Sequence, residues 1–86
     1  MNKIEFNDNY INDIITGSSD IFTLKWQEEL EDGNWSIVLM DQSNACYQGV
    51  VSQNDKGEYS IVGDTEFDKV YPVFNKDTGK IVKINS

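Results

Sequence analysis

The alternation of apolar and polar residues on either side of one glycine turn constrains the fold of this chain most. From residue 21 onward the pattern has a period of two, which is typical of strands with one buried face. The apolar positions are Phe22, Leu24, Trp26, Leu30, Trp35, Ile37 and Leu39. Asp32-Gly33 is typical of a tight hairpin turn, which pairs Leu30 with Trp35 and Trp26 with Leu39. The sequence therefore predicts a β-hairpin, because the turn residues and the apolar alternation indicate the same register.

Four further segments have strand character. They are residues 46–53, 58–63, 69–74 and 80–84. Four-residue turns before the first two would align Ile37, Val50 and Ile61 on one sheet face. The last two flank a turn that ends at Gly79. Pro72 has no amide hydrogen, so its strand should lie at an edge or carry a bulge.

A short helix is predicted over residues 7–16. Asn7 is a suitable cap and Gly17 a suitable stop. The residues at helical spacing between them are Tyr10, Ile11, Ile14 and Ile15. The second sheet face is too apolar to be solvated, since it carries Val38, Met40, Tyr47, Val51 and Val62. We expect the helix stripe to cover that face, and a partner protein or a second copy is the alternative.

The length of 86 residues suits one hydrophobic core, so we expect a single domain over residues 1–86. The fold class is α+β and mainly β. A short N-terminal helix (7–16) packs on a five- to six-stranded antiparallel meander sheet or small barrel formed by residues 21–86.

Residue types needed for most catalytic sites are missing from the chain. Without histidine there is no imidazole base, no Ser-His-Asp triad and no histidine metal ligand. Cys46 has apolar neighbours and is predicted to be a small core residue. The segment 64–68 resembles a calcium loop but lacks the glycine and the closing glutamate of that motif. We therefore predict no enzyme activity, no catalytic residues, no metal and no cofactor.

Net charge is the most unusual property of the chain. The chain has fifteen acidic residues and seven lysines, which gives a net charge of −8. Such a charge repels nucleic acid and anionic membranes, so direct binding of either is not expected. It attracts a protein partner with a basic surface. The alternative is that the charge serves solubility alone.

The acidic residues form two clusters that we predict to bind this partner. The first surrounds the hairpin turn and the second alternates along an extended segment. They comprise Glu28, Glu29, Glu31 and Asp32, and then Asp64, Glu66 and Asp68. Alternate strand residues lie about 6.6 Å apart, close to twice the phosphate rise of one nucleic-acid strand, so mimicry of the backbone is geometrically feasible. Met40 or Tyr47, on the second face, is the predicted apolar anchor.

No secretory signal and no run of about 20 apolar residues is visible, so we expect a cytoplasmic protein. A single cysteine agrees with a reducing compartment.

Two resemblances concern parts or bulk properties of the chain. Asn75-Lys76-Asp77-Thr78-Gly79-Lys80-Ile81-Val82 resembles the terminal hairpin of the PepSY domain, a mostly extracytoplasmic family. In size and charge the chain is similar to small acidic phage proteins that inhibit host nucleases, restriction enzymes or CRISPR effectors. The resemblance implies a protein-binding inhibitor or adaptor that occupies a basic nucleic-acid-binding surface. The alternative is a non-enzymatic assembly protein that forms homo-oligomers through the apolar sheet face or the Pro72 strand.

Overall fold

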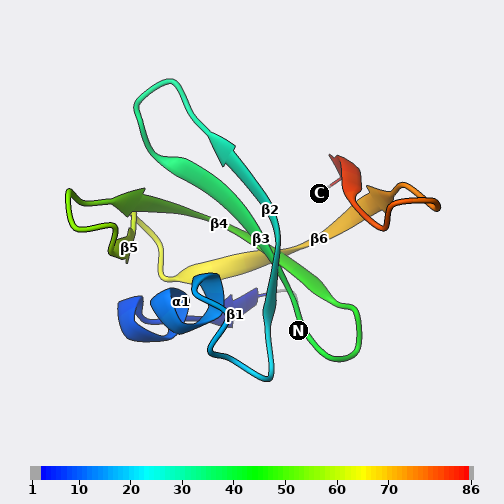
Figure 1. Cartoon of the computed structure of the whole chain (residues 1–86), viewed down its shortest axis with the longest axis horizontal. Coiled ribbons are helices and arrows are strands. Elements are labelled where there is room, and N and C mark those ends of the chain that lie inside the picture. Colours follow the sequence, from blue (N-terminus) through cyan, green and yellow to red (C-terminus); the bar gives the residue numbers. More distant parts are fainter. Residues whose placement is uncertain (1–2, 86) are drawn as a thin grey trace.

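Figure 1 shows a computed structural model of the chain, which describes residues 3–85. Within that range, seven antiparallel strands and one helix form an open sheet with the helix on one face. The elements are β1 (Lys3–Glu5), α1 (Asp8–Ile15), β2 (Thr23–Glu29), β3 (Trp35–Met40), β4 (Cys46–Gln53), β5 (Tyr59–Ile61), β6 (Glu66–Phe74) and β7 (Ile81–Asn85). The predicted class, α+β and mainly β with an N-terminal helix, is confirmed. The sheet does not close into the barrel offered as an alternative, and β1 was not predicted.

The strand order departs from a simple meander at β6. β2, β3, β4 and β5 follow one another, but β6 returns to lie beside β4, and β1 pairs with the far side of β6. β4 is long enough for two neighbours on one edge. Cys46 to Gln48 pair with β6, and Val51 to Gln53 pair with β5. This return places residues 66–68 between β1 and the sheet, so that β1 lies next to them.

Each hairpin between β2 and β5 turns through three residues, and this corrects the predicted registers. The backbone bonds that close the loops are Leu30 N to Asn34 O, Asp41 N to Ala45 O and Asn54 N to Glu58 O. The third loop residue has a positive φ in each, at Gly33, Asn44 and Gly57. The predicted loops contain two or four residues, so every register shifts by one.

The shifted registers change which residues are cross-strand partners. Trp35 pairs with Glu29 rather than Leu30. Ile37 lies opposite Gly49, and it is Val51 that pairs with Ile61. The predicted Ile37, Val50 and Ile61 column is therefore wrong, because Val50 points to the other face of the sheet.

A β-bulge in β2 explains a second departure from the predicted pattern. Trp26, which the predicted register places opposite Leu39, lies opposite Val38, and Leu24 lies opposite Leu39 instead. The register shifts between Leu24 and Trp26, so the two side chains point to opposite faces. The sequence gives no sign of this bulge, because apolar and polar residues continue to alternate through it.

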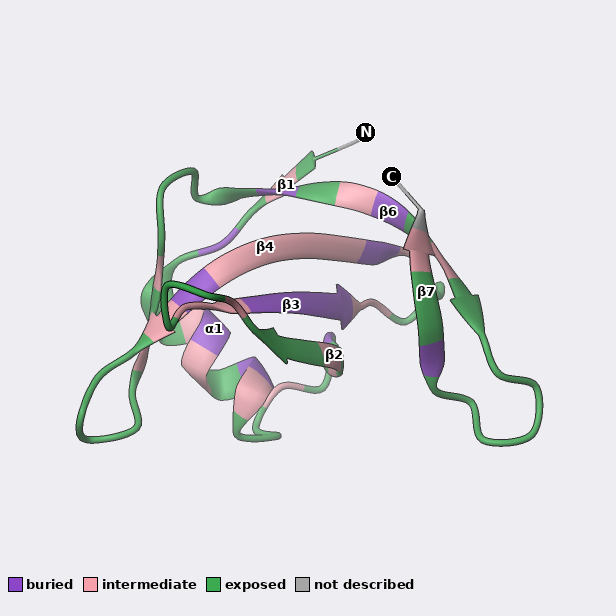
Figure 2. Cartoon of the chain, turned by 90° about the horizontal axis from the view of Figure 1, so that it is seen from above, coloured by how far each residue is buried: buried purple, intermediate pink, exposed green. Residues whose placement is uncertain are grey.

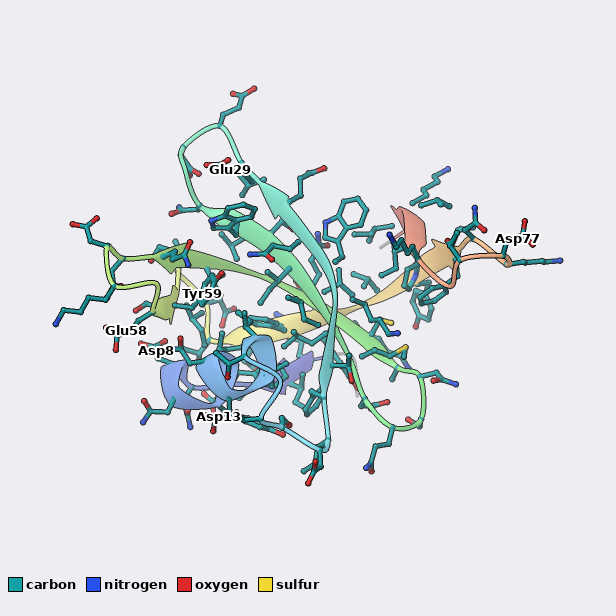
Figure 3. The ribbon with its side chains drawn as sticks, viewed as in Figure 1. Asp8, Asp13, Glu29, Glu58, Tyr59 and Asp77 are labelled. Carbon is teal, nitrogen blue, oxygen red and sulfur yellow. The ribbon has the colours of Figure 1, made fainter. Side chains whose placement is uncertain are left out.

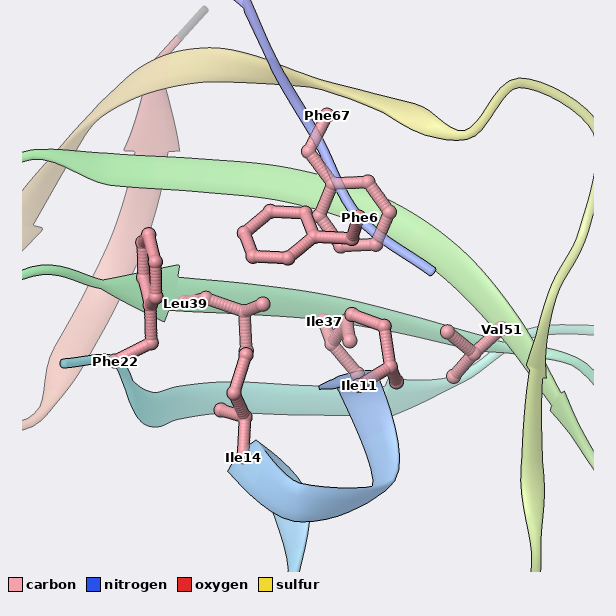
Figure 4. Packing of buried hydrophobic residues seen from close by; sticks show 8 residues of the cluster. All are labelled: Phe6, Ile11, Ile14, Phe22, Ile37, Leu39, Val51 and Phe67. Carbon is pink, nitrogen blue, oxygen red and sulfur yellow. The ribbon is translucent and has the colours of Figure 1, made fainter. Parts of the chain in front are cut away.

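The helix α1 covers the sheet face opposite to the predicted one. Asn7 caps it as predicted, with its Oδ1 accepting the Tyr10 amide at 2.8 Å. Ile11 and Ile14 are buried. They pack in a cluster with Phe6, Phe22, Ile37, Leu39, Val51 and Phe67 (Figure 4).

The opposite face is covered over one end by the C-terminal strand. Val38, Cys46 and Val70 form a second buried cluster with Ile81 of β7, and Ile84 packs against it. Figure 2 shows β7 turned across that end of the sheet. The five residues assigned to one apolar face are Val38, Met40, Tyr47, Val51 and Val62. They are divided between the two faces because Tyr47 pairs with Leu39 and Val51 lies in the helix cluster. Of the edge position or bulge predicted for the Pro72 strand, the structure has a bulge, with a register shift between Val73 and Phe74.

Candidate functional site

A groove remains open on the sheet face that β7 covers only in part. It has a volume of about 260 Å³ and lies beyond the second cluster, over β3, β4 and β6. We call it the acidic groove. Its lining residues are Ser36, Gln48, Gly49, Val50, Val62, Asp64, Glu66 and Asp68. The whole second predicted cluster of acids is therefore in one hollow.

The groove acids come from the start of β6 and the turn before it. Glu66 and Asp68 are two residues apart on one strand, so they share a face about 6.6 Å apart. Asp64 precedes them, and its Oδ1 accepts the Glu66 amide at 2.9 Å. This bond holds the turn that leads into β6, and all three carboxylates remain exposed. The groove is thus lined by solvated negative charge.

Strand β1 adds two charges to this rim. Glu5 pairs with Glu66 and Lys3 pairs with Asp68. Lys3 Nζ lies 3.6 Å from Asp68 Oδ1, and both side chains are more than half exposed. Such a pair contributes at most about 1 kcal/mol, so it does not remove Asp68 from binding.

The remaining lining is partly apolar and otherwise uncharged. Gln48 Nε2 donates to Ser36 Oγ at 2.9 Å, which satisfies the hydroxyl of the buried Ser36. Val62 is exposed and Val50 partly so. In the part of the chain that the structure describes, no three Cys, Asp or Glu side chains are grouped so as to hold a metal ion. The groove can therefore contact another molecule through its carboxylates and its valine side chains.

The first predicted cluster is not part of the groove lining. Glu28 pairs with Ser36 and therefore shares the groove face, whereas Glu29 pairs with Trp35 on the opposite face. Figure 3 shows Glu29 on the hairpin between β2 and β3. Glu31 and Asp32 lie in the loop, where Asp32 Oδ1 accepts the amide of Asn34 at 3.0 Å. Glu28 alone of this cluster extends the acidic face.

The two predicted apolar anchors do not share a face. Met40 pairs with Cys46 and packs against the second cluster, while Tyr47 pairs with Leu39 on the helix side. Tyr47 packs against Phe22, with ring centroids 6.5 Å apart. Each is half-buried by these contacts. The exposed apolar side chain in the groove is Val62 instead.

Glu5, Ser36 and Gln48 belong to this surface but were not predicted from the sequence. The alternation in Lys3-Ile4-Glu5-Phe6 is a strand signal that would have placed Glu5 on a solvated face. Its pairing with Glu66 has no local signal, because the partners lie 61 positions apart in the chain.

Across residues 3–85, no helix has the length and apolar character needed to cross a membrane. Comparison of the chain with protein-family models, curated proteins and solved structures finds no match.

Proposed function

We propose that this protein is a non-enzymatic inhibitor or adaptor whose acidic groove face binds a basic surface of another protein in the cytoplasm. The single observation that carries the proposal is the common hollow of Asp64, Glu66 and Asp68, with Val62 exposed among them. Charge and an apolar contact on one surface are what a protein interface combines. The structure thus supports a binding surface better than a uniform solubilising charge.

The partner class follows from the spacing and sign of the charges. Side chains on alternate strand positions repeat at about 6.6 Å, close to twice the axial rise of about 3.4 Å per phosphate along one strand of a duplex. Lysines and arginines placed to hold that strand therefore fit the carboxylates of Glu66 and Asp68. Glu28, on the same face across β3, widens the negative surface. We propose a nucleic-acid enzyme as target, in the manner of phage proteins that counter host defence, including anti-CRISPR proteins.

The second candidate function is a non-enzymatic assembly protein. It is favoured by four exposed apolar side chains on the hairpin of β6 and β7, which contains the predicted Pro72 strand, and not by the predicted sheet face. The predicted face has Val38 and Val51 buried within the monomer.

A pull-down from bacterial lysate with matched variants tests the proposed function. The groove variant changes Glu28→Gln, Glu66→Gln and Asp68→Asn. The tip variant changes Glu29→Gln, Glu31→Gln and Asp32→Asn, which removes as many charges outside the groove. We expect the wild type and the tip variant to retain a nucleic-acid enzyme at about 0.1 M salt, and the groove variant to lose it.

Two further measurements make the pull-down decisive. Raising the salt to about 0.5 M should release the captured enzyme, because screening shortens the range of exposed charges. Added single-stranded DNA should compete for the same surface of the enzyme. Equal capture by the groove variant, or capture that DNA does not reduce, would contradict the proposal.

A further inference from the structure

The C-terminal hairpin of β6 and β7 differs in charge from the rest of the molecule. Over residues 69–85, beyond Glu66 and Asp68 at the start of β6, it holds Lys69, Lys76, Lys80 and Lys83, four of the seven lysines in the chain, and one acid, Asp77. Four lysines against one aspartate give this segment a net charge of +3, on a protein of net charge −8. The hairpin is therefore a basic segment at one end of an acidic molecule (Figure 1).

The same hairpin exposes large apolar side chains. They are Tyr71, Val73, Phe74 and Val82. Tyr71 is 60% exposed and Val82 is 58% exposed, so the fold of one copy does not bury them. A shallow hollow of about 410 Å³, lined in part by Tyr71 and Phe74, adjoins the hairpin. Exposed apolar side chains gathered on one element are typical of an interaction surface.

Lysines lie beside Tyr71 and Val73, the two of these side chains that share one face of the hairpin. Lys69 Nζ lies 5.8 Å from the centre of the Tyr71 ring, and Lys83 pairs with Val73. Valine side chains neither stack on bases nor bind phosphate, so Val73 and Val82 favour a protein partner over nucleic acid. The fitting partner has carboxylates around an apolar patch.

We propose that the partner is a second copy of this chain, whose acidic groove receives the hairpin. The groove has the required chemistry, with carboxylates of Asp64, Glu66 and Asp68 beside Val50 and Val62. The inference concerns the groove of the proposed function, but it needs no foreign partner and is tested on purified protein.

The geometry makes this contact head-to-tail. The nine residues of β6 extend about 26 Å, with the acidic groove at their beginning and the apolar hairpin at their end. Each copy then presents a groove at one end and a hairpin at the other. Such heterologous contacts form closed rings where the rotation between copies closes and open linear assemblies where it does not. An occupied groove is also closed to a basic partner, so self-assembly would compete with the proposed function.

The net charge keeps the contact weak. Copies of net charge −8 repel one another, but at physiological salt the repulsion decays over about 8 Å. Opposite charges that touch across the contact attract within that distance, whereas acids on distant parts of the two copies are screened. We expect self-association at protein concentrations on the order of 100 µM.

Sedimentation velocity with charge-swapped variants tests the contact. The swapped hairpin variant carries Lys80→Glu and Lys83→Glu. The swapped groove variant, different from the groove variant of the pull-down, carries Glu66→Lys and Asp68→Lys. All four side chains are exposed, so each variant should fold. A control, Lys25→Glu with Lys56→Glu, makes the same reversals outside the hairpin.

We expect the wild type and the control to exceed the 9.8 kDa monomer mass as concentration rises, and each swapped variant alone to stay monomeric. Mixing the two swapped variants should restore assembly, because each hairpin again meets a groove of opposite charge. That restoration also proves that both variants are folded. A wild type that stays monomeric to about 1 mM, or a mixture that stays monomeric, would overturn the inference. Neither result would affect the capture of a foreign enzyme, so the two proposals fail separately.

Discussion

The carboxamide of Asn12 makes two hydrogen bonds to the backbone of Tyr59 on the outer edge of β5. Nδ2 donates to the Tyr59 carbonyl at 2.7 Å, and Oδ1 accepts the Tyr59 amide at 2.8 Å. One helical turn earlier, Asp8 Oδ1 accepts the Ile61 amide at 2.9 Å (Figure 3). Two helix side chains thus do for β5 what a neighbouring strand does in a sheet, and an otherwise open edge is closed.

Replacing Asn12 by alanine should therefore destabilise the whole fold. Asn12→Ala leaves the Tyr59 amide and carbonyl without partners, and we expect the free energy of unfolding to fall by about 2 kcal/mol. Urea unfolding followed by tryptophan fluorescence measures the change. Asp13→Ala, on the exposed side of the helix, is the control and should alter stability by less than about 0.5 kcal/mol. Equal stability of the two variants would contradict the role of Asn12.

Gly49 should not tolerate a side chain, because the ring of Phe67 lies against it. A Cβ at position 49 would overlap the Phe67 ring, which is completely buried (Figure 4 shows its place in the cluster). We expect Gly49→Ala to cost about 2 kcal/mol or more, since a packed core does not yield to added volume. Combining it with Phe67→Leu should cost less than the two single changes together. Strict additivity in urea unfolding would show that the two residues do not conflict.

Stability should fall in acid partly because of Asp41. Slight burial works the other way, but bonds from the Ser43 hydroxyl and from the amides of Ala45 and Ser43 hold the pKa of Asp41 below its ordinary value. A lowered pKa in the folded state stabilises the fold above the unfolded pKa of about 3.9. This contribution is lost as pH falls through the folded value.

Asp41→Asn removes this proton linkage and keeps the acceptor oxygen. We expect its free energy of unfolding to decline less between pH 5 and pH 3 than that of the wild type. Asp55→Asn, in another hairpin loop, is the matched control. Parallel pH profiles for the wild type and Asp41→Asn would exclude a contribution from this carboxylate.

Cys46 should react slowly with thiol reagents in the folded protein. Burial, and then the negative charge of Asp41, raise the pKa of the thiol, although Lys25 opposes them. The side chain is only 2% exposed, so both the thiolate fraction and access to it are low. Alkylation at pH 8 should be at least about tenfold slower than in urea-unfolded protein. Equal rates would place the thiol at the surface, against the packing of the second cluster.

Local patterns predicted what depends on near neighbours in the chain. The Asn7 cap and the isoleucine stripe predicted the helix, and the turn residues on either side predicted the bounds of β4, residues 46–53. Asp64, Glu66 and Asp68 were expected on one face, and all three line one groove: Glu66 and Asp68 are two apart in β6 and point the same way, while Asp64 precedes them in the turn and accepts the Glu66 amide. The burial of Cys46 followed from its apolar neighbours.

Registers needed more than local pattern. Asp32-Gly33 is compatible with loops of two or three residues, and the difference moves every partner by one position. The bulge at Lys25 is equally invisible, since alternation continues through it. As a result, Trp26 lies opposite Val38 and Val50 lies opposite Ser36, both on the sheet face that the helix does not cover.

The sequence by itself determined the class of the fold, the helix, most strands and the pairing of carboxylates along β6, because these depend on hydrogen bonds and side-chain periodicity within a few residues. Only the tertiary structure decided that β6 returns beside β4, that Glu5 meets Glu66, and that the lysine-rich hairpin lies at the far end of β6 from the acidic groove. These contacts join distant parts of the chain. They are selected by how the whole core packs, through steric constraints such as Phe67 over Gly49, which no local pattern contains.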